Sequence, residues 1–111
     1  MSDLNQKTCL PCESGVKPLT LVEAEALLTT LHTPWTLNDD GTSISRLFHF
    51  KDFYQTMSFV NAVAHVANSE NHHPDLDIGW GRCRVVYTTH SIGGLSENDF
   101  ICAAKVNSLP R

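Results

Sequence analysis

The chain has 111 residues, of which 41% are hydrophobic and 18% are charged. This length and this balance predict one globular domain and exclude a disordered chain. The net charge of −4, with no run of Lys and Arg, argues against binding to nucleic acid or to an anionic membrane. No apolar stretch approaches the roughly 20 residues that cross a bilayer, and the polar segment 1–7 does not resemble a signal peptide. Together these features predict a cytoplasmic protein.

Polar residues broken by two prolines and a glycine predict an irregular N-terminal arm over 1–18, followed by a single domain over 19–111. Thr20 and Glu23 form a capping box, which predicts a first helix over about 21–32. Pro34 ends that helix, because the residue before a proline is pushed out of the helical conformation.

A β-hairpin is predicted next, because a short strand over 35–37 and an alternating strand over 44–50 flank the turn signal at 38–41. Asp52 then caps the longest helix, which ends at 69–71 and carries an apolar stripe. The stripe comprises Phe53, Met57, Val60, Ala64 and Ala67, widened by Phe59, Val63 and Val66.

A run rich in β-branched and aromatic residues predicts a strand over 82–90. A second capping box, formed by Ser96 and Asp99, precedes a third helix over 100–106. The order is thus helix, strand, strand, helix, strand, one further strand that the residues do not locate, and helix. This order, with its tight hairpin, predicts an α+β domain whose antiparallel sheet has its helices on one face.

The four cysteines are predicted to be reduced thiols, given the absence of a secretory signal. Cys83 lies in a strand pattern and Cys102 in a helix pattern, so both are expected to be buried. Cys9-x-x-Cys12 is half of a zinc or redox motif, but no second pair follows at zinc-ribbon spacing. We therefore favour an unliganded thiol pair over a structural metal site.

Three histidines mark the ends of predicted elements. His72 and His73 end the long helix just before Pro74, and His90 ends a strand just before a glycine-rich turn. Functional sites are commonly built at such ends, and two or three converging imidazoles can donate and accept protons in one turnover. The alternative is that they are capping or surface residues. We predict acid–base catalysis by His72, His73 and His90.

A zinc site built from the same three histidines is the rival interpretation. The spacing matches no His-Glu-x-x-His motif, and simultaneous ligation by the adjacent His72 and His73 is awkward. We therefore predict no metal.

Longer motifs extend these observations. The run Asn71-His72-His73-Pro74, the later Thr89-His90, and Gly93-Gly94-Leu95-Ser96 with Asn98-Asp99 resemble the pterin-4a-carbinolamine dehydratases, as does Phe48-His49-Phe50-Lys51-Asp52-Phe53. The segment His90-Ser91-Ile92 with Asn98-Asp99-Phe100-Ile101, and the N-terminal Cys9-x-x-Cys12, resemble the bacterial branch of that family. The resemblance covers residues 21–104 in the same element order. It implies a four-stranded antiparallel sheet with three helices packed on one face, and a homodimer or homotetramer.

The reaction that this resemblance implies is the dehydration of 4a-hydroxytetrahydrobiopterin to quinonoid dihydropterin and water, which recycles the cofactor of aromatic amino-acid hydroxylases. By motif, His72 and His90 would be the acid–base pair, and His73 would orient the pterin. The implied substrate-binding residues are Asn71, Pro74, Thr89, Ser91 and Trp35. Neither a metal nor a cofactor is needed, since the pterin is the substrate. Asn71 and Ser91 depart from the animal members, which carry acidic residues there.

Two other functions fit the same resemblance. One is a protein-binding coactivator or dimerisation module, although a pure adaptor would not need all three histidines. The other is the same fold acting in molybdopterin metabolism. The implied partners are a small pterin and, functionally, a hydroxylase, with no nucleic acid and no membrane.

Overall fold

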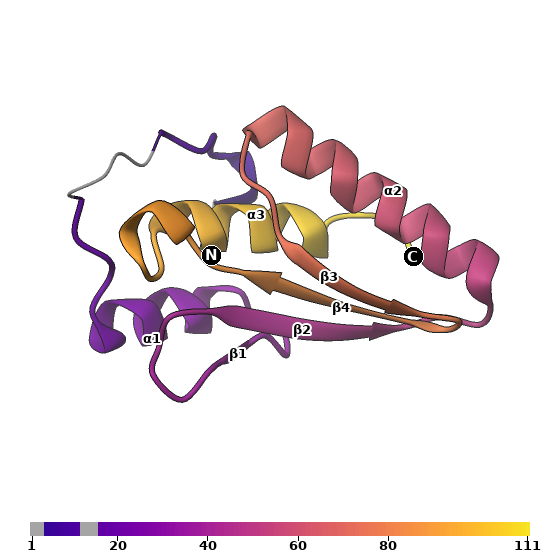
Figure 1. The fold of residues 1–111 in the computed structure, drawn as a ribbon, viewed down its shortest axis with the longest axis horizontal. Helices are drawn as coiled ribbons and strands as arrows, with labels where there is room; N and C mark the ends of the chain where they lie inside the picture. Colours follow the sequence, from indigo (N-terminus) through magenta and orange to yellow (C-terminus); the bar gives the residue numbers. More distant parts are fainter. Residues whose placement is uncertain (1–3, 12–15) are drawn as a thin grey trace.

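The computed structural model describes residues 4–11 and 16–111. One sheet and its helices form the body of the molecule (Figure 1). The elements in chain order are a 3-10 turn at Leu4–Gln6, α1 (Leu21–Thr30), β1 (Thr36–Leu37), β2 (Ile44–His49), α2 (Phe53–Glu70), β3 (Asp75–Gly79), β4 (Arg82–Tyr87), a second 3-10 turn at His90–Ile92, and α3 (Glu97–Asn107).

The sheet has four strands in the order β1-β2-β4-β3, and each neighbouring pair is antiparallel. Alternate residues of β2 and β4 are buried, including Ile44, Phe48, Val85 and Tyr87, which places the core on one face of the sheet. The predicted fold class, a four-stranded antiparallel sheet with three helices on one face, is confirmed.

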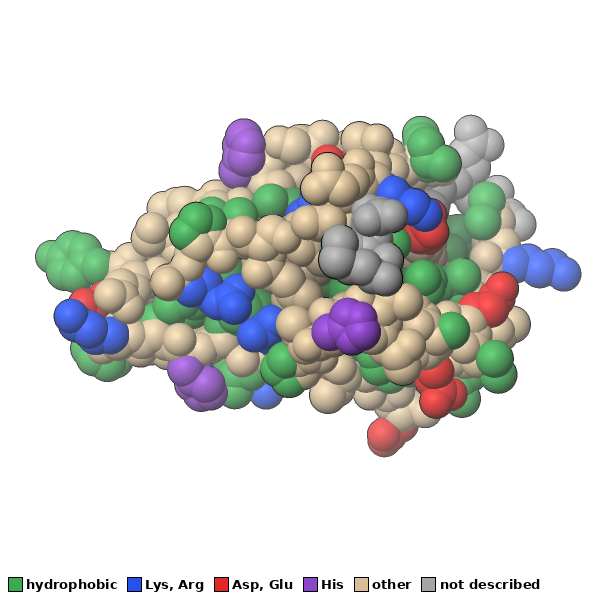
Figure 2. All heavy atoms as spheres, turned by 180° about the vertical axis from the view of Figure 1, so that it is seen from behind, with side chains coloured by type: hydrophobic (Ala, Val, Ile, Leu, Met, Phe, Trp, Pro, Cys, Tyr) green, Lys and Arg blue, Asp and Glu red, His purple; other side chains and the backbone are tan. Residues whose placement is uncertain are grey.

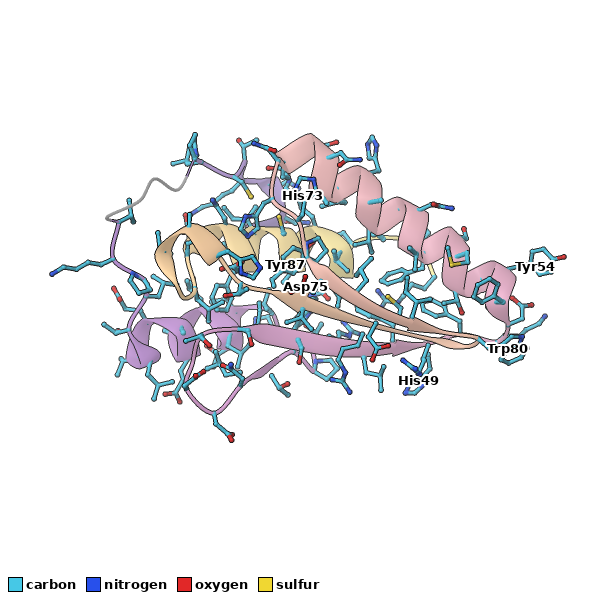
Figure 3. All side chains as sticks on the ribbon, in the orientation of Figure 1. His49, Tyr54, His73, Asp75, Trp80 and Tyr87 are labelled. Atoms are coloured by element: carbon cyan, nitrogen blue, oxygen red, sulfur yellow. The ribbon has the colours of Figure 1, made fainter. Side chains whose placement is uncertain are left out.

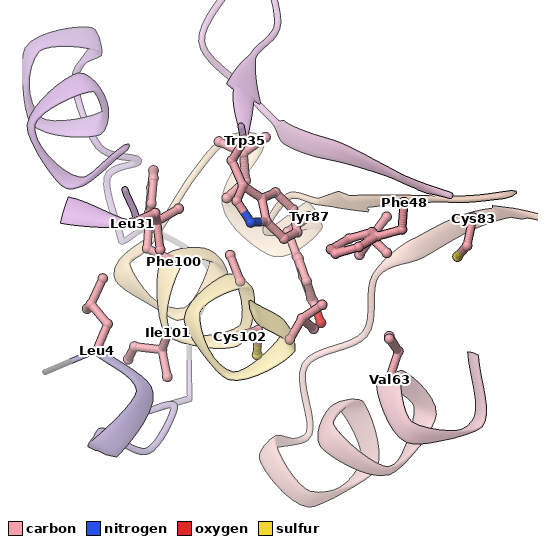
Figure 4. Packing of buried hydrophobic residues seen from close by; sticks show 14 of the residues in the cluster. Leu4, Leu31, Trp35, Phe48, Val63, Cys83, Tyr87, Phe100, Ile101 and Cys102 are labelled. Carbon is pink, nitrogen blue, oxygen red and sulfur yellow. The ribbon is translucent and has the colours of Figure 1, made fainter. Parts of the chain in front are cut away.

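Aromatic side chains fill the centre of this core (Figure 4). The Trp35 indole, 3% exposed, lies 6.2 Å from the Tyr87 ring and 6.3 Å from the Phe48 ring between ring centroids. Its Nε1 donates a hydrogen bond of 2.8 Å to Asn107 Oδ1 at the end of α3. Trp35 therefore joins β1, the sheet and α3, and burial of its indole contributes about 2–3 kcal/mol to folding.

The α2 helix begins and ends as the sequence predicts, but its buried stripe is rotated relative to the prediction. Phe53 is 47% exposed and Ala64 is also exposed. The residues of α2 that are buried are Thr56, Phe59, Val60, Val63, Val66 and Ala67. Thr56 faces the β3–β4 turn, and its hydroxyl lies 2.9 Å from the Trp80 carbonyl oxygen and 2.8 Å from the Asp52 carbonyl oxygen, either of which can accept its proton.

Several element boundaries differ from their predictions for local reasons. The α1 helix ends at Thr30 instead of His32, because His32 adopts a left-handed φ of 53°. The β4 strand ends at Tyr87, and His90 lies in a 3-10 turn instead of at a strand end. Asp75–Gly79 forms the strand that the residues do not locate, and it lies before β4. Two aspartates and a glycine give this segment little intrinsic strand preference, so its pairing with β4 must supply the stability.

The N-terminal arm packs against the body of the domain. Leu4 is 5% exposed and belongs to the core cluster, and its 3-10 turn lies against α3 (Figure 4). Cys12 lies outside the described residues.

Charged side chains are scattered over the face turned away from the viewer in Figure 1. Figure 2 shows basic side chains in several separate places on that face, interspersed with acidic and apolar ones. No helix within residues 4–11 and 16–111 has the length and hydropathy needed to span a membrane.

The Asp52 cap of α2 can be tested directly. The Asp52 carboxylate accepts a hydrogen bond of 2.8 Å from the backbone N–H of Gln55. We predict that Asp52→Ala lowers the free energy of unfolding by about 1 kcal/mol, because the helix loses this acceptor. Asp52→Asn keeps an acceptor and serves as the matched control. Urea denaturation of both variants measures the difference, and equal losses would contradict the capping role.

Candidate active site

A pocket of about 470 Å³ lies where α2, β4, the second 3-10 turn and the N-terminal arm meet. Its volume is within the range of pockets that bind small molecules. Figure 3 shows His73, Asp75 and Tyr87 near the middle of the molecule, whereas Tyr54 and Trp80 lie at one end of it. The lining residues are Cys9, Leu10, Pro11, Glu70, Asn71, His72, His73, Thr88, Thr89, His90, Ser91 and Asn98.

His72 is the most constrained of the three predicted histidines. Asn71 ends α2 in a left-handed conformation with φ of 51°, which turns the chain back so that His72 faces α3. The Nε2 atom of His72 lies 2.6 Å from Asp99 Oδ1. The His72 side chain is 12% exposed and that of Asp99 is fully buried. A contact this short between an imidazole and a buried carboxylate is a charge-assisted hydrogen bond, in which Nε2–H donates to Asp99.

The Asp99 carboxylate is held by three donors from different parts of the chain. Besides His72, the Thr89 hydroxyl donates to Oδ2 over 2.8 Å and the Ser96 backbone N–H donates to Oδ2 over 2.9 Å. The last bond belongs to the capping box that begins α3, so the capping box predicted from sequence is confirmed. Both carboxylate oxygens of Asp99 therefore have hydrogen-bond partners, which a carboxylate buried away from water requires.

The His72 ring also packs against Tyr87. The two rings are nearly parallel, with an interplanar angle of 7° and centroids 5.9 Å apart. Burial raises the pKa of the Tyr87 phenol well above its usual value, so the phenol stays neutral beside the imidazole. Tyr87 and Asp99 together fix the orientation of the His72 ring, which leaves Nδ1 as the nitrogen available to a ligand.

The other two histidines are more open to solvent. His73 is exposed, and its Nε2 lies 3.1 Å from Asn68 Oδ1 one turn back along α2. His90 is 77% exposed, and its Nε2 lies 4.0 Å from the Asp75 carboxylate. The three histidines therefore share one pocket, and they range from a buried imidazole to a solvent-exposed one.

The predicted substrate-binding residues separate into two groups. Asn71, Thr89 and Ser91 line the pocket, although the Thr89 hydroxyl is engaged by Asp99. Pro74 is half-buried between His73 and β3, and it is not one of the lining residues. Trp35 does not line the pocket either, because its indole is packed in the core and bonded to Asn107.

Other residues contribute to the site without having been singled out as site residues in the sequence. The sequence identifies Asp99 only as part of a helix capping box. Its contact with His72 is additional and depends on tertiary packing. Asn98 exchanges two hydrogen bonds with the backbone of Leu10, which brings the arm to the pocket. Glu70 accepts from the Cys9 backbone N–H over 2.8 Å. The signal in the sequence that could have predicted an acidic partner for His72 is the motif Asn98-Asp99, which the family resemblance includes.

Imidazole side chains that line a pocket of this size are able to exchange protons with a small molecule. Within residues 4–11 and 16–111, no group of three or more His, Cys, Asp and Glu side chains is placed to hold a metal ion. The pocket instead offers a buried, carboxylate-oriented imidazole and an exposed imidazole. The fold and the site thus define a small α+β domain with a histidine-lined pocket.

Comparisons with known proteins identify the family. The model of the pterin 4 alpha carbinolamine dehydratase family matches residues 17–109. A protein of Nitrosomonas eutropha named "Putative pterin-4-alpha-carbinolamine dehydratase" is 61% identical over 107 residues, covering 96% of this chain and 93% of its own. The chain belongs to the pterin-4a-carbinolamine dehydratase family, and the predictions of this family and of a hydro-lyase are confirmed.

Solved structures agree with the fold. The crystal structure of a transcriptional coactivator/pterin dehydratase from Brucella melitensis has a TM-score of 0.78 and 34% identity, and the match covers 83% of this chain and 97% of that chain. A pterin dehydratase-like protein described as a RuBisCO assembly factor in the alpha-carboxysome has a TM-score of 0.60 and 20% identity, with 70% of this chain and 90% of that chain covered. The second match supports the fold alone.

The geometry at Asp99 predicts the tautomer of His72. We expect the proton on Nε2 in the native protein, because the Asp99 carboxylate can only accept. In Asp99→Asn, the amide oxygen can still accept from Ser96 while the NH2 group faces His72, so the proton should move to Nδ1. Nitrogen-15 NMR of the histidine rings measures this change.

The control for this experiment is Asp75→Asn, which removes the exposed carboxylate near His90. It should leave the His72 tautomer unchanged. An unchanged His72 spectrum in folded Asp99→Asn protein would contradict the proposed orientation.

Proposed function

We propose that this pocket dehydrates 4a-hydroxytetrahydropterins to quinonoid dihydropterins. The reaction breaks the C4a–O bond, removes the proton from N5 and releases water. It therefore needs one group that protonates the departing hydroxyl and one that accepts the N5 proton. The observation that carries the proposal is the buried His72–Asp99 pair in a pocket shared with His73 and His90.

His72 is the proposed base. With Nε2–H committed to Asp99, the lone pair of Nδ1 is the proton acceptor that His72 can present to a ligand. Asp99 stabilises the imidazolium that forms when this nitrogen takes a proton, as a buried carboxylate does in other histidine-dependent enzymes. The low exposure of His72 strengthens that interaction, because water does not screen it.

His90 is the proposed acid, and His73 orients the pterin. His90 is exposed at the pocket, and its Nε2 lies 4.0 Å from the carboxylate of Asp75. It can therefore give a proton to the departing hydroxyl and regain one from solvent. His73 shares the pocket edge with Asn71 and Ser91, whose polar groups can bind the pterin ring.

The proposal also covers the substrate, its source and the oligomeric state of the protein. We propose that the pterin is 4a-hydroxytetrahydrobiopterin or a close relative, and that its source is a cytoplasmic aromatic amino-acid hydroxylase. The protein would act as a homodimer or homotetramer without a metal or a cofactor. Light scattering tests the oligomeric state, and chelator treatment of the active protein tests the metal.

Single-histidine variants test the catalytic roles. We predict that His72→Ala and His90→Ala lower kcat by about 100-fold or more, because each removes one proton-transfer group. His73→Ala should mainly raise KM, because it removes a binding contact. The 4a-carbinolamine is generated in situ by an aromatic amino-acid hydroxylase, and quinonoid dihydropterin formation is followed by absorbance.

His49→Ala is the matched control, since His49 is exposed on β2 and does not line the pocket. Its turnover should equal that of the native protein. Native turnover in His72→Ala would contradict the assigned base. No acceleration by the native protein over the spontaneous reaction would overturn the dehydratase proposal, and would favour a protein-binding role or a different pterin.

A further inference from the structure

Two cysteines from distant parts of the chain meet beside the pocket. The Sγ atoms of Cys9, on the N-terminal arm, and Cys102, in α3, are 3.5 Å apart. Both are free thiols, and the distance is a non-bonded contact, since the sulfurs of a disulfide lie about 2.05 Å apart. Closing the bond requires the sulfurs to approach by about 1.5 Å. Cys9 is half-buried and Cys102 is fully buried.

Hydrogen bonds hold the arm in the position that creates this contact. The Cys9 backbone N–H donates to Glu70 on α2, and the Leu10 backbone N–H donates to the side chain of Asn98 over 3.0 Å. The Asn98 amide donates in return to the Leu10 carbonyl. The Cys9 thiol also points at the Asn98 carbonyl, with a sulfur–oxygen distance of 3.7 Å. The two thiols are therefore held close together by bonds on both sides of Cys9.

The two thiols differ in their access to solvent. Cys9 lines the pocket and is half-buried, so it is the more accessible of the two residues. Cys102 is enclosed by the core next to Tyr87 (Figure 4). Cys102 has no exposed surface, so solutes do not reach its sulfur, and contact with Cys9 and burial also raise the pKa of its thiol. Cys9 is consequently the thiol that meets an oxidant first.

We propose that Cys9 and Cys102 form a redox modification site, in which hydrogen peroxide converts the thiol pair to a disulfide that fastens the arm to α3. In the first step Cys9 attacks one peroxide oxygen, which gives Cys9 sulfenic acid and water. In the second step the Cys102 sulfur attacks the Cys9 sulfur, the S–O bond breaks, and the thiol proton leaves with the hydroxyl as a second water. Two thiols are oxidised and one peroxide is reduced.

The position of the bond links it to the active-site wall. Cys9, Leu10 and Pro11 are the residues of the arm that line the pocket, which His73 and His90 also line. A disulfide between Cys9 and Cys102 fixes this wall covalently. Because the two residues are 93 positions apart, it also constrains a long loop in the unfolded chain. The oxidation does not depend on any pterin reaction, so its failure would not affect the dehydratase proposal.

Peptide mapping tests the pairing. The full chain is treated with hydrogen peroxide, remaining thiols are alkylated, and the protein is digested with trypsin without reductant. Cys9 and Cys12 lie in the peptide 8–46, because trypsin does not cleave before Pro18, and Cys102 lies in the peptide 85–105. We expect these two peptides to be joined in the oxidised protein and separated by dithiothreitol. Oxidation should also raise Tm by about 10 °C, reversibly.

Three variants separate this pair from other outcomes. Cys9→Ser should abolish both the joined peptide and the rise in Tm, whereas Cys12→Ser and the buried control Cys83→Ala should keep both. A disulfide confined to the peptide 8–46 in the native protein would overturn the proposal, because it would pair Cys9 with Cys12. Reduced Cys102 after peroxide treatment that has oxidised Cys9 would overturn it as well.

Discussion

The buried carboxylate of Asp99 is the group on which the site depends. It begins α3 by accepting from Ser96, it binds the hydroxyl of Thr89 after β4, and it holds the imidazole of His72 at the end of α2. A charge with no exposure is tolerated because each of its oxygens has a donor. Three segments that are distant in sequence are thereby tied to one point, and that point adjoins the pocket.

The same constraint joins stability to function. A helix cap, a loop after a strand and the imidazole of His72 share one carboxylate, so movement of one of them disturbs the others. The stacking of His72 on Tyr87 extends the coupling into the aromatic core, where Trp35 and Phe48 pack. A ring held on its face and at one nitrogen has little rotational freedom. Orientation of this kind lowers the entropy that a reaction must lose when its groups come together.

Sequence patterns predict those features that local rules govern. The caps at Thr20, Asp52 and Ser96 place the starts of the helices, and alternation along β2 identifies its buried face. The histidine motif locates the candidate site because its residues lie close together in sequence or in a recognisable order. These predictions rest on short spacings, in which each residue interacts with others only a few positions away.

Features that depend on tertiary contacts are not predictable in this way. Asp75–Gly79 becomes a strand because β4 pairs with it, and its own residues favour a turn. Trp35 has the chemistry of a ligand-binding residue, but its indole donates a hydrogen bond to Asn107 and is buried in the core. The arm reaches the pocket because the Asn98 side chain forms hydrogen bonds with the backbone of Leu10, which is 88 positions away in the sequence. No local pattern encodes these bonds.

The arrangement of His72 restricts how protons can move through the site. Its Nε2 faces a carboxylate that is sealed from solvent, so a proton accepted at Nδ1 has no exit through the far side of the ring. It must leave by the nitrogen at which it arrived. In the proposed mechanism, the base can therefore be reset only after the product has left and water can reach Nδ1. The proposal thus makes a single hydrogen bond set the order of turnover and product departure.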